Sequence, residues 1–252
     1  LEDTTRTEQL LHFFQEEQDA AWNTYVMVTK EPLKDIFSED LKLPESLGIY
    51  LEDLLEEWED VRQGAQVTVG TLMSQYYSRN ETLCVPVVEI SDAEEKPQIG
   101  GFCVLFGLQP MGELSLREGE QLMLLQNNLK RYAFTMQNGT RFLLEQVQTE
   151  REITAAVDEA GNQYPVLTVT VRGNSTVSAL SWDADQEDQR QQGKQELADR
   201  LLTFLTTQQK EAGMDLANSF LLLAGQERSL WEQYREEPAQ YLSDLKIRLF
   251  VE

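Results

Sequence analysis

The side chains that could do chemistry in this sequence are mostly carboxylates. Its 252 residues include 44 Asp and Glu, but one His and two Cys. The histidine, His12, lies in an apolar stretch, which is typical of a helix position beside a core. One histidine excludes a two-histidine metal site, and no Ser or Thr has an identifiable base partner for a triad. Gly100, Gly101 and Gly107 lack the spacing of a phosphate-binding loop. These patterns point away from catalysis.

Two groups of carboxylates have a spacing that chemistry could use. The first consists of Glu56, Glu57, Glu59 and Asp60, and the second of Asp183, Asp185, Glu187 and Asp188. The first group could supply an acid/base pair, although a solvated helix face explains it better. The second resembles a calcium loop without the Gly at its sixth position or the Glu at its twelfth, so acids at a helix start explain it better. We therefore predict no catalytic residue, no cofactor and no metal site.

Cysteines and tryptophans offer two further possibilities. Cys84 and Cys103 are too few and too far apart for a disulfide scaffold or a zinc site, and a single bridge between them stays open. The tryptophans, which could stack on a sugar or a peptide, are Trp22, Trp58, Trp182 and Trp231. Because Trp58 and Trp231 fall on apolar helical faces, we expect them in a core.

The formal charge of −23 is the strongest compositional feature. It argues against nucleic acid as a partner and against a basic patch that adsorbs to anionic lipid. The longest apolar run, 220–224, is far shorter than the roughly 20 residues that span a bilayer. At a membrane, a lipid or a protein partner would have to hold the chain. Since the sequence starts at Leu1 rather than Met, we expect that its natural N-terminus has been removed.

The stretch 99–128 is the clearest structural unit in the sequence. Phe102–Phe106 predicts a buried strand, and Gln109–Gly112 has the Pro and Gly spacing of a tight turn. Ser115 and Glu118 form a capping box at the start of a helix. This unit is structural, and its residues by themselves indicate no particular reaction or ligand.

The segments before this unit predict helices and two strands. We expect an amphipathic helix over 1–22, a strand over 24–29, a helix after Pro44 and another over 68–77. A strand over 83–90 contains Pro86 and is therefore expected at a sheet edge. The charged stretch 91–98 is a candidate domain boundary.

The segments after it predict a sheet, helices and a returning strand. Asn138-Gly139 is a hairpin signal within a meander of up to four strands. A helix to about Lys210 follows, and Asp215 is placed to cap a short helix over 216–224. Another helix ends before Pro238, and an alternating strand closes the chain.

We therefore expect an α+β fold with two to three small domains in series, each a mostly antiparallel sheet with packed helices. The expected domains are residues 1–95, the remainder of a first domain, then 99–130, a small middle domain, and 131–252, a C-terminal domain.

Three stretches carry a family resemblance. They are Asn23–Lys30 (NTYVMVTK), the segment GGFCVLFGLQPMGELSLREGEQLMLL that starts at Gly100, and the series Gln209-Lys210-Glu211, Gly213, Asp215-Leu216 and Trp231. In these stretches the chain resembles the Ger(x)C family, the C subunits of spore germinant receptors with GerAC-type lipoproteins as type members. Asn218 and Phe220 stand where the family usually has small glycines.

The resemblance implies the following expectations. The chain is a non-enzymatic accessory C subunit that acts in nutrient-triggered germination through contacts with integral-membrane A and B subunits. An N-terminal lipid anchor, absent from this chain together with the start of the first domain, tethers it to the outer face of the inner spore membrane. Gly101, Gly112, Asp215 and Trp231 are structural motif positions.

Two other functions stay open on the residues alone. One is an exported solute-binding protein for sugars or peptides, with Trp22 or Trp182 in a groove. The other is a carboxylate-dependent hydrolase with two close acids in a cleft.

Overall fold

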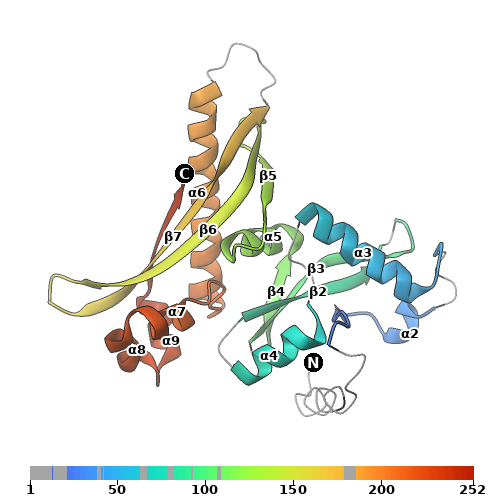
Figure 1. Cartoon of the computed structure of the whole chain (residues 1–252), viewed down its shortest axis with the longest axis horizontal. Helices are drawn as coiled ribbons and strands as arrows, with labels where there is room; N and C mark the ends of the chain where they lie inside the picture. The colour runs from blue at the N-terminus through green and yellow to red at the C-terminus, as the bar shows by residue number, and fades with distance from the viewer. Residues whose placement is uncertain are drawn as a thin grey trace. The chain divides into compact units, whose positions relative to one another are not determined.

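A computed structural model describes residues 13, 22–38, 41, 43–62, 67–78, 82–91, 93–106, 109–178 and 186–252, with the backbone alone for 57–62, 75–78 and 210–211. It divides into two compact units, Leu1–Gly119 and Glu120–Glu252. Each unit contains a four-stranded sheet with helices, so the expected α+β class is confirmed (Figure 1). His12, Trp182, Asp183, Asp185 and nearly all of the helix expected over 1–22 lie outside the described residues. The division into three domains stays a prediction.

The sheet of the first unit has the order β1-β2-β3-β4. Its strands are β1 (Val28–Thr29), β2 (Thr82–Ile90), β3 (Pro97–Phe106) and β4 (Gln109–Ser115). β1 runs parallel to β2, and the other pairs are antiparallel. The helices are α2 (Leu33–Ile36), α3 (Leu47–Arg62), α4 (Val69–Ser78) and the first turn of α5 (Leu116–Leu125), which continues into the second unit after Gly119. The expected helices over 68–77 and after Pro44 are confirmed, and the second of these begins at Leu47.

The charged stretch considered as a domain boundary is a hairpin connection in the structure. β2 and β3 pair from Ile90 and Pro97 onward, and Ser91 N–H donates to the carbonyl of Lys96 at 2.8 Å. The polar composition of this stretch therefore reflects a solvent-exposed turn within one sheet.

Three expectations for the first sheet need correction. The segment Gln109–Gly112 is part of β4 rather than a turn, because it pairs with β3 up to Phe106. Pro110 is tolerated there because β4 is an edge strand. β2 is not an edge strand, since β1 pairs with its residues Val87 and Val88. Pro86 lies just outside this pairing, where its missing N–H costs no hydrogen bond to β1. Of the strand expected over 24–29, only Val28–Thr29 (β1) forms a strand.

The core of the first unit includes one face of its sheet. Val69, Leu72 and Met73 of α4 pack with Val85, Val87, Cys103 and Leu105 of the strands. Val85 lies directly opposite Cys103 and Cys84 lies opposite Val104, so the two cysteines point to opposite faces of the sheet. Both are free thiols, which answers the open question of a bridge between them.

The sheet of the second unit has the order β5-β6-β7-β8. Its strands are β5 (Arg131–Thr135), β6 (Arg141–Val157), β7 (Gln163–Ser178) and β8 (Lys246–Val251). β8 runs parallel to β7, and the other pairs are antiparallel. The Asn138-Gly139 hairpin is confirmed, with Gly139 at φ +83°. β6 and β7 are long and continuous because a bulge at Gln146, φ 54°, accommodates the irregularity between Glu145 and Gln148.

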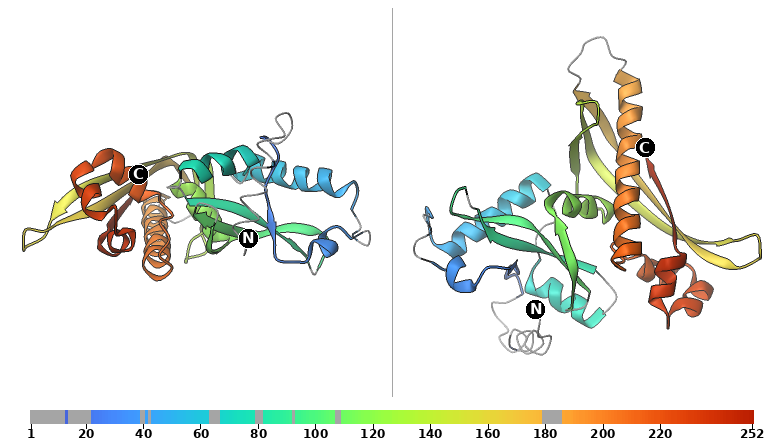
Figure 2. Two further views of the ribbon diagram at one scale, coloured as in Figure 1. Left: turned by 90° about the horizontal axis from the view of Figure 1, so that it is seen from below. Right: turned by 180° about the vertical axis from the view of Figure 1, so that it is seen from behind.

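Four helices complete the second unit. They are α6 (Gln186–Glu211), α7 (Ser219–Gln226), α8 (Arg228–Tyr234) and α9 (Pro238–Asp244). α6 runs along the sheet, as Figure 2 shows, and its Leu197 and Leu201 are fully buried. α7 begins at Ser219 rather than Leu216. α9 was not predicted, although Pro238 at its first turn is a helix-start signal. Among the described helices, none combines the length and the apolar character that a membrane span requires.

In each unit a helix approaches the sheet through a glycine that faces a phenylalanine ring. A Cβ added at Gly119 of α5 would lie 2.1 Å from the ring of Phe102 on β3. A Cβ at Gly193 of α6 would likewise lie 2.1 Å from the ring of Phe142 on β6. Both rings are fully buried. These helix–sheet distances therefore require glycine.

We expect Gly193→Ala to lower the free energy of unfolding by about 1–3 kcal/mol, because the methyl group overpacks the contact with Phe142. Urea denaturation measures this change. Gly225→Ala in α7 is the matched control, since a Cβ there meets nothing within 4 Å. The control should be neutral or gain up to about 1 kcal/mol. Equal effects of the two substitutions would contradict this account of the contact.

Candidate functional site

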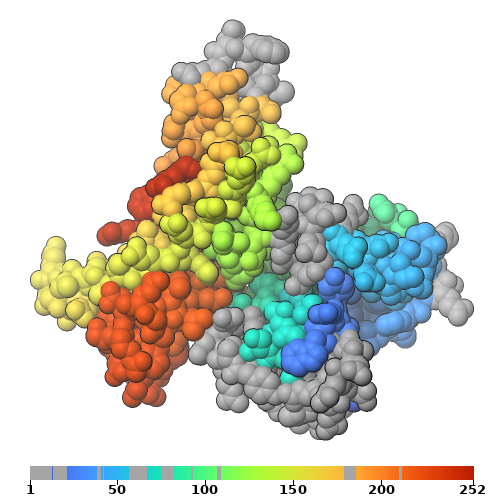
Figure 3. Space-filling view, viewed as in Figure 1, coloured from blue at the N-terminus to red at the C-terminus, as the bar shows by residue number. Residues whose placement is uncertain are grey.

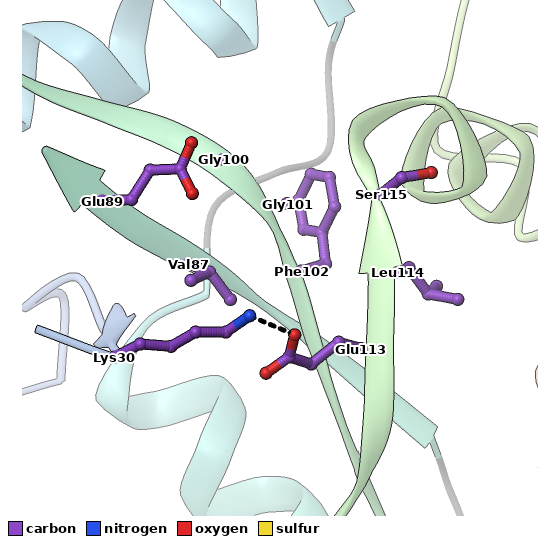
Figure 4. A pocket seen from close by; sticks show the side chains of 9 residues that line it. All are labelled: Lys30, Val87, Glu89, Gly100, Gly101, Phe102, Glu113, Leu114 and Ser115. Atoms are coloured by element: carbon purple, nitrogen blue, oxygen red, sulfur yellow. Dashed lines mark hydrogen bonds and ion pairs between the residues drawn. The ribbon is translucent and has the colours of Figure 1, made fainter. Parts of the chain in front are cut away.

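A pocket of about 250 Å³ lies in the first unit, over the middle of its sheet (Figure 4). Its walls come from β2, β3, β4 and the residue that follows β1. The lining residues are Lys30, Val87, Glu89, Gly100, Gly101, Phe102, Glu113, Leu114 and Ser115.

The floor of the pocket is formed by a bulge and two glycines. Val87 pairs with Gly101 and Val88 pairs with Ile99, so Gly100 is the extra residue of the bulge. A Cβ at Gly100 would lie 2.1 Å from the carboxyl carbon of Glu89, and a Cβ at Gly101 would lie 2.5 Å from the carbonyl oxygen of Leu114. The absence of side chains at both positions opens the pocket and lets the Glu89 carboxylate lie against the backbone.

The charged groups of the pocket stand on two sides of Val87, as Figure 4 shows. On one side Lys30 donates a hydrogen bond to Glu113, and the pair is more than half exposed. This bond raises the pKa of Lys30, so the ammonium stays charged at neutral pH. On the other side the Oε1 atom of Glu89 accepts a hydrogen bond from Gln98 Nε2 at 3.0 Å. The pocket thus presents one cation and two carboxylates.

The arrangement is suited to recognising ions rather than to nucleophilic chemistry. Burial raises the pKa of the Cys103 thiol beside the pocket, and it raises the pKa of Cys84 to about 12. Both thiols are therefore protonated at neutral pH, whereas the thiolate is the reactive form. Within the ranges that the structure describes, no three His, Cys, Asp or Glu side chains are grouped as metal ligands.

The four predicted motif positions are divided between the two units. Gly101 lines the pocket, and Gly112 lies on β4 opposite Val104. Asp215 and Trp231 belong to the second unit.

Asp215 lies in the connection between the end of α6 and the start of α7. Its carboxylate accepts hydrogen bonds from Ser219 N–H at 2.9 Å, Ser219 Oγ at 2.7 Å and Phe220 N–H at 2.8 Å. These bonds satisfy amide groups at the helix start that would otherwise be unpaired. Burial raises the pKa of Asp215, against the opposing effect of these bonds and of Arg151. The position is therefore a buried helix cap.

The expectation that Trp231 lies in a core is wrong. Its side chain is half-buried, with the guanidinium carbons of Arg228 and Arg235 at 4.9 and 5.9 Å from the ring centroid. Leu230 and Tyr234, one helical turn apart, form the buried face of α8 instead. Trp231 follows Leu230 and is rotated about 100° away from that face. Trp22 is also exposed, by 52%, and nothing is described of the Trp58 side chain.

The charged residues of the pocket were not found from the sequence. Lys30 and Glu113 are 83 positions apart, and no spacing pattern connects them with Glu89. Only the order of the strands brings the three together.

Comparison with known proteins supports the predicted family resemblance. Residues 2–90 match the family described as Spore germination protein N-terminal domain. A solved structure, the crystal structure of the GerBC protein, is similar to this chain with a TM-score of 0.72 and 13% sequence identity. The match covers 97% of this chain and 72% of that chain. A search of the curated proteins found no match.

At 13% identity the likeness to GerBC establishes the fold, and the domain match relates residues 2–90 to spore germination proteins. The structure is an α+β fold, and residues 2–90 match a spore germination protein N-terminal domain. The resemblance to the GerAC-type spore germination proteins is confirmed.

We expect Gly101→Ala and Gly100→Ala to differ in stability. The methyl group at position 101 collides with the carbonyl of Leu114 inside the β3–β4 ladder, so unfolding free energy should fall by about 1–3 kcal/mol. At position 100 the methyl group meets only the mobile end of Glu89, so the change should stay within about 0.5 kcal/mol. Urea denaturation of both variants tests this difference, and an equal loss would refute it.

Replacing Asp215 tests the buried cap. Asp215→Ala leaves the amides of Ser219 and Phe220 unpaired, so we expect a loss of about 1–3 kcal/mol in unfolding free energy. Asp158→Ala is the control, because Asp158 also accepts backbone N–H bonds, from Ala160 and Asn162, but in an exposed turn. Thermal or urea unfolding should show a clearly smaller loss for the control.

Proposed function

We propose that this chain is the C subunit of a spore germinant receptor, a non-enzymatic accessory protein in nutrient-triggered germination. The observation that carries the proposal is the match of residues 2–90 to the spore germination protein N-terminal domain. The similarity to GerBC over 97% of the chain supports it, because the resemblance then extends beyond that domain.

In this proposal the chain is tethered by an N-terminal lipid to the outer face of the inner spore membrane. The charge of −23 supports a tether, since a strongly acidic surface is repelled by anionic lipid. Contacts with integral-membrane A and B subunits would add a second attachment, and a single acyl chain alone binds membranes only reversibly.

Exposed features of the second unit support a role in protein contacts. The C-terminal end of β6 and the N-terminal end of β7 form a two-stranded arm that projects beyond helices α7–α9 (Figure 3). Val157, at the tip of this arm, is 60% exposed. On β8, alternate residues Lys246, Arg248 and Phe250 are exposed, with Phe250 at 50%. Because β8 is an edge strand of its sheet, we take this exposed face as the candidate surface for a partner.

The decisive experiment is co-purification from spore membranes with the full-length protein, including any residues that precede Leu1. We expect the A and B subunits to be recovered with it, and we expect deletion of its gene to abolish the response to one nutrient. Phe250→Ser should reduce recovery of the partners while leaving the protein folded. Val157→Ser tests separately whether the arm contributes to the same recovery.

Recovery of the protein in a membrane-free fraction without the other subunits, together with unchanged germination of the deletion strain, would refute the proposal. Those outcomes would favour the exported solute-binding protein instead.

A further inference from the structure

We infer that β8 accepts an added strand, an extended segment of a partner chain that carries acidic residues on one face and apolar residues on the other. β8 lies at the end of the second sheet and pairs with β7 on one side (Figure 1). Addition of a strand to such an edge is a general mode of peptide recognition. This inference deepens the proposed function, on which it rests for the existence of a partner, and it specifies the chemistry of the contact.

The backbone of β8 presents hydrogen-bonding groups at the free edge. Glu252 N–H donates to the carbonyl of Val171 at 2.8 Å, and the carbonyl of Glu252 accepts a bond from Gly173 N–H at 3.4 Å. Because these groups alternate in direction along a strand, every second residue of β8 turns its N–H and C=O away from β7. These residues are Ile247, Leu249 and Val251. An added strand would supply partners for their donors and acceptors.

The apolar face of β8 is only partly covered. α6 packs against β8, and the residues whose backbone groups point to the free edge are half-buried. Their partners on β7, in contrast, are fully buried. These partners are Leu167, Val169 and Val171. The apolar layer of the sheet is therefore incomplete at β8, and apolar side chains of an added strand would extend it.

The opposite face of β8 carries cations. Lys246 and Arg248 are exposed, and neither forms an ion pair within the described part of the chain. Other basic residues of this unit do pair with carboxylates, among them Arg172, Arg200 and Arg228. The two cations of β8 are therefore available to acidic residues on a neighbouring strand, where cross-strand pairs of opposite charge are favourable.

The distances across the sheet favour these cations over the carboxylates of the same face. In the strand register Glu152 of β6 lies opposite Thr168 of β7, which lies opposite Arg248. An added strand would lie about 4.8 Å from β8 but about 14 Å from β6. The screening length at physiological ionic strength is about 8 Å, so Arg248 would act on it more strongly than Glu152. Glu252, at the end of β8, is already paired with Arg172.

A second copy of this chain fits the edge less well. Its β8 would bring the same two cations to the contact, and like charges opposite each other are destabilising. Each chain also carries a formal charge of −23. Charged side chains on edge strands commonly prevent unspecific pairing. Because both charges here are positive, they disfavour a strand of the same kind and favour an acidic one.

The test uses the purified full chain and a blocked, fluorescently labelled peptide of alternating valine and glutamate with the length of β8. Fluorescence anisotropy measures the dissociation constant. One control peptide carries lysine in place of glutamate. The other keeps glutamate but is methylated at every backbone nitrogen, so it has the same charge and no backbone donors. We expect saturable binding of the valine–glutamate peptide and at least about tenfold weaker binding of both controls.

Amide hydrogen exchange, followed by NMR, locates the contact. The bound peptide should slow exchange at the amides of Ile247, Leu249 and Val251, which point to the free edge. The amides of Arg248 and Phe250 already face β7, so their exchange should not change.

A charge-reversal variant tests the cations. Lys246→Glu combined with Arg248→Glu should raise the dissociation constant of the valine–glutamate peptide at least about tenfold. Both side chains are exposed, so the melting temperature should change little. The matched control combines Arg131→Glu with Arg141→Glu. It makes the same change of charge at exposed positions near the other edge of the sheet and should leave binding unchanged.

The inference is overturned if the valine–glutamate peptide shows no saturable binding, if either control peptide binds as tightly, or if the protected amides lie outside β8. A dimer in sedimentation experiments that the Lys246→Glu, Arg248→Glu variant dissociates would make a second copy the occupant and would also overturn it. Peptide binding is measured without membrane subunits. Its failure therefore leaves co-purification unaffected, and failure of co-purification leaves peptide binding unaffected, so the two proposals are tested separately.

Discussion

The close contact between a helix glycine and a buried phenylalanine ring is the constraint on which both units depend. Gly119 faces Phe102 in the first unit, and Gly193 faces Phe142 in the second. Protein interiors are packed so densely that even one added methyl group must displace its neighbours. The position of α5 on β3 and that of α6 on β6 are therefore set by the same device.

This packing also decides where the pocket lies. Because the Phe102 ring faces α5, its neighbours Gly101 and Cys103 must point to the opposite face of β3. Cys103 there enters the core under α4, and Gly101 becomes part of the pocket floor. One strand thus supplies a helix contact on one face and both a core and a polar recess on the other.

The electrostatics of the molecule favour binding over reaction. Its thiols are held protonated by burial, and its buried carboxylate, Asp215, is committed to capping α7. The charged side chains of the Lys30–Glu113 pair in the pocket are instead more than half exposed, and exposed ion pairs exchange partners at low cost.

Local sequence patterns by themselves determined much of the secondary structure. The Ser115–Glu118 capping box is present, with Ser115 Oγ donating to the Glu118 carboxylate at 2.7 Å. The alternation of Leu167, Val169 and Val171 produced a strand in which all three are fully buried. These features depend on residues within a few positions of one another, so the sequence alone specifies them.

Tertiary structure decided the features that depend on distant partners. Gln109–Gly112 has turn residues, yet the ladder with β3 makes it a strand. The orientation of Trp231 follows from which face of α8 the core covers, and the Lys30–Glu113 pair joins residues 83 positions apart. Hydrogen-bond ladders, packing and ion pairs between remote segments form only when the chain is folded, and the pocket is made of such contacts.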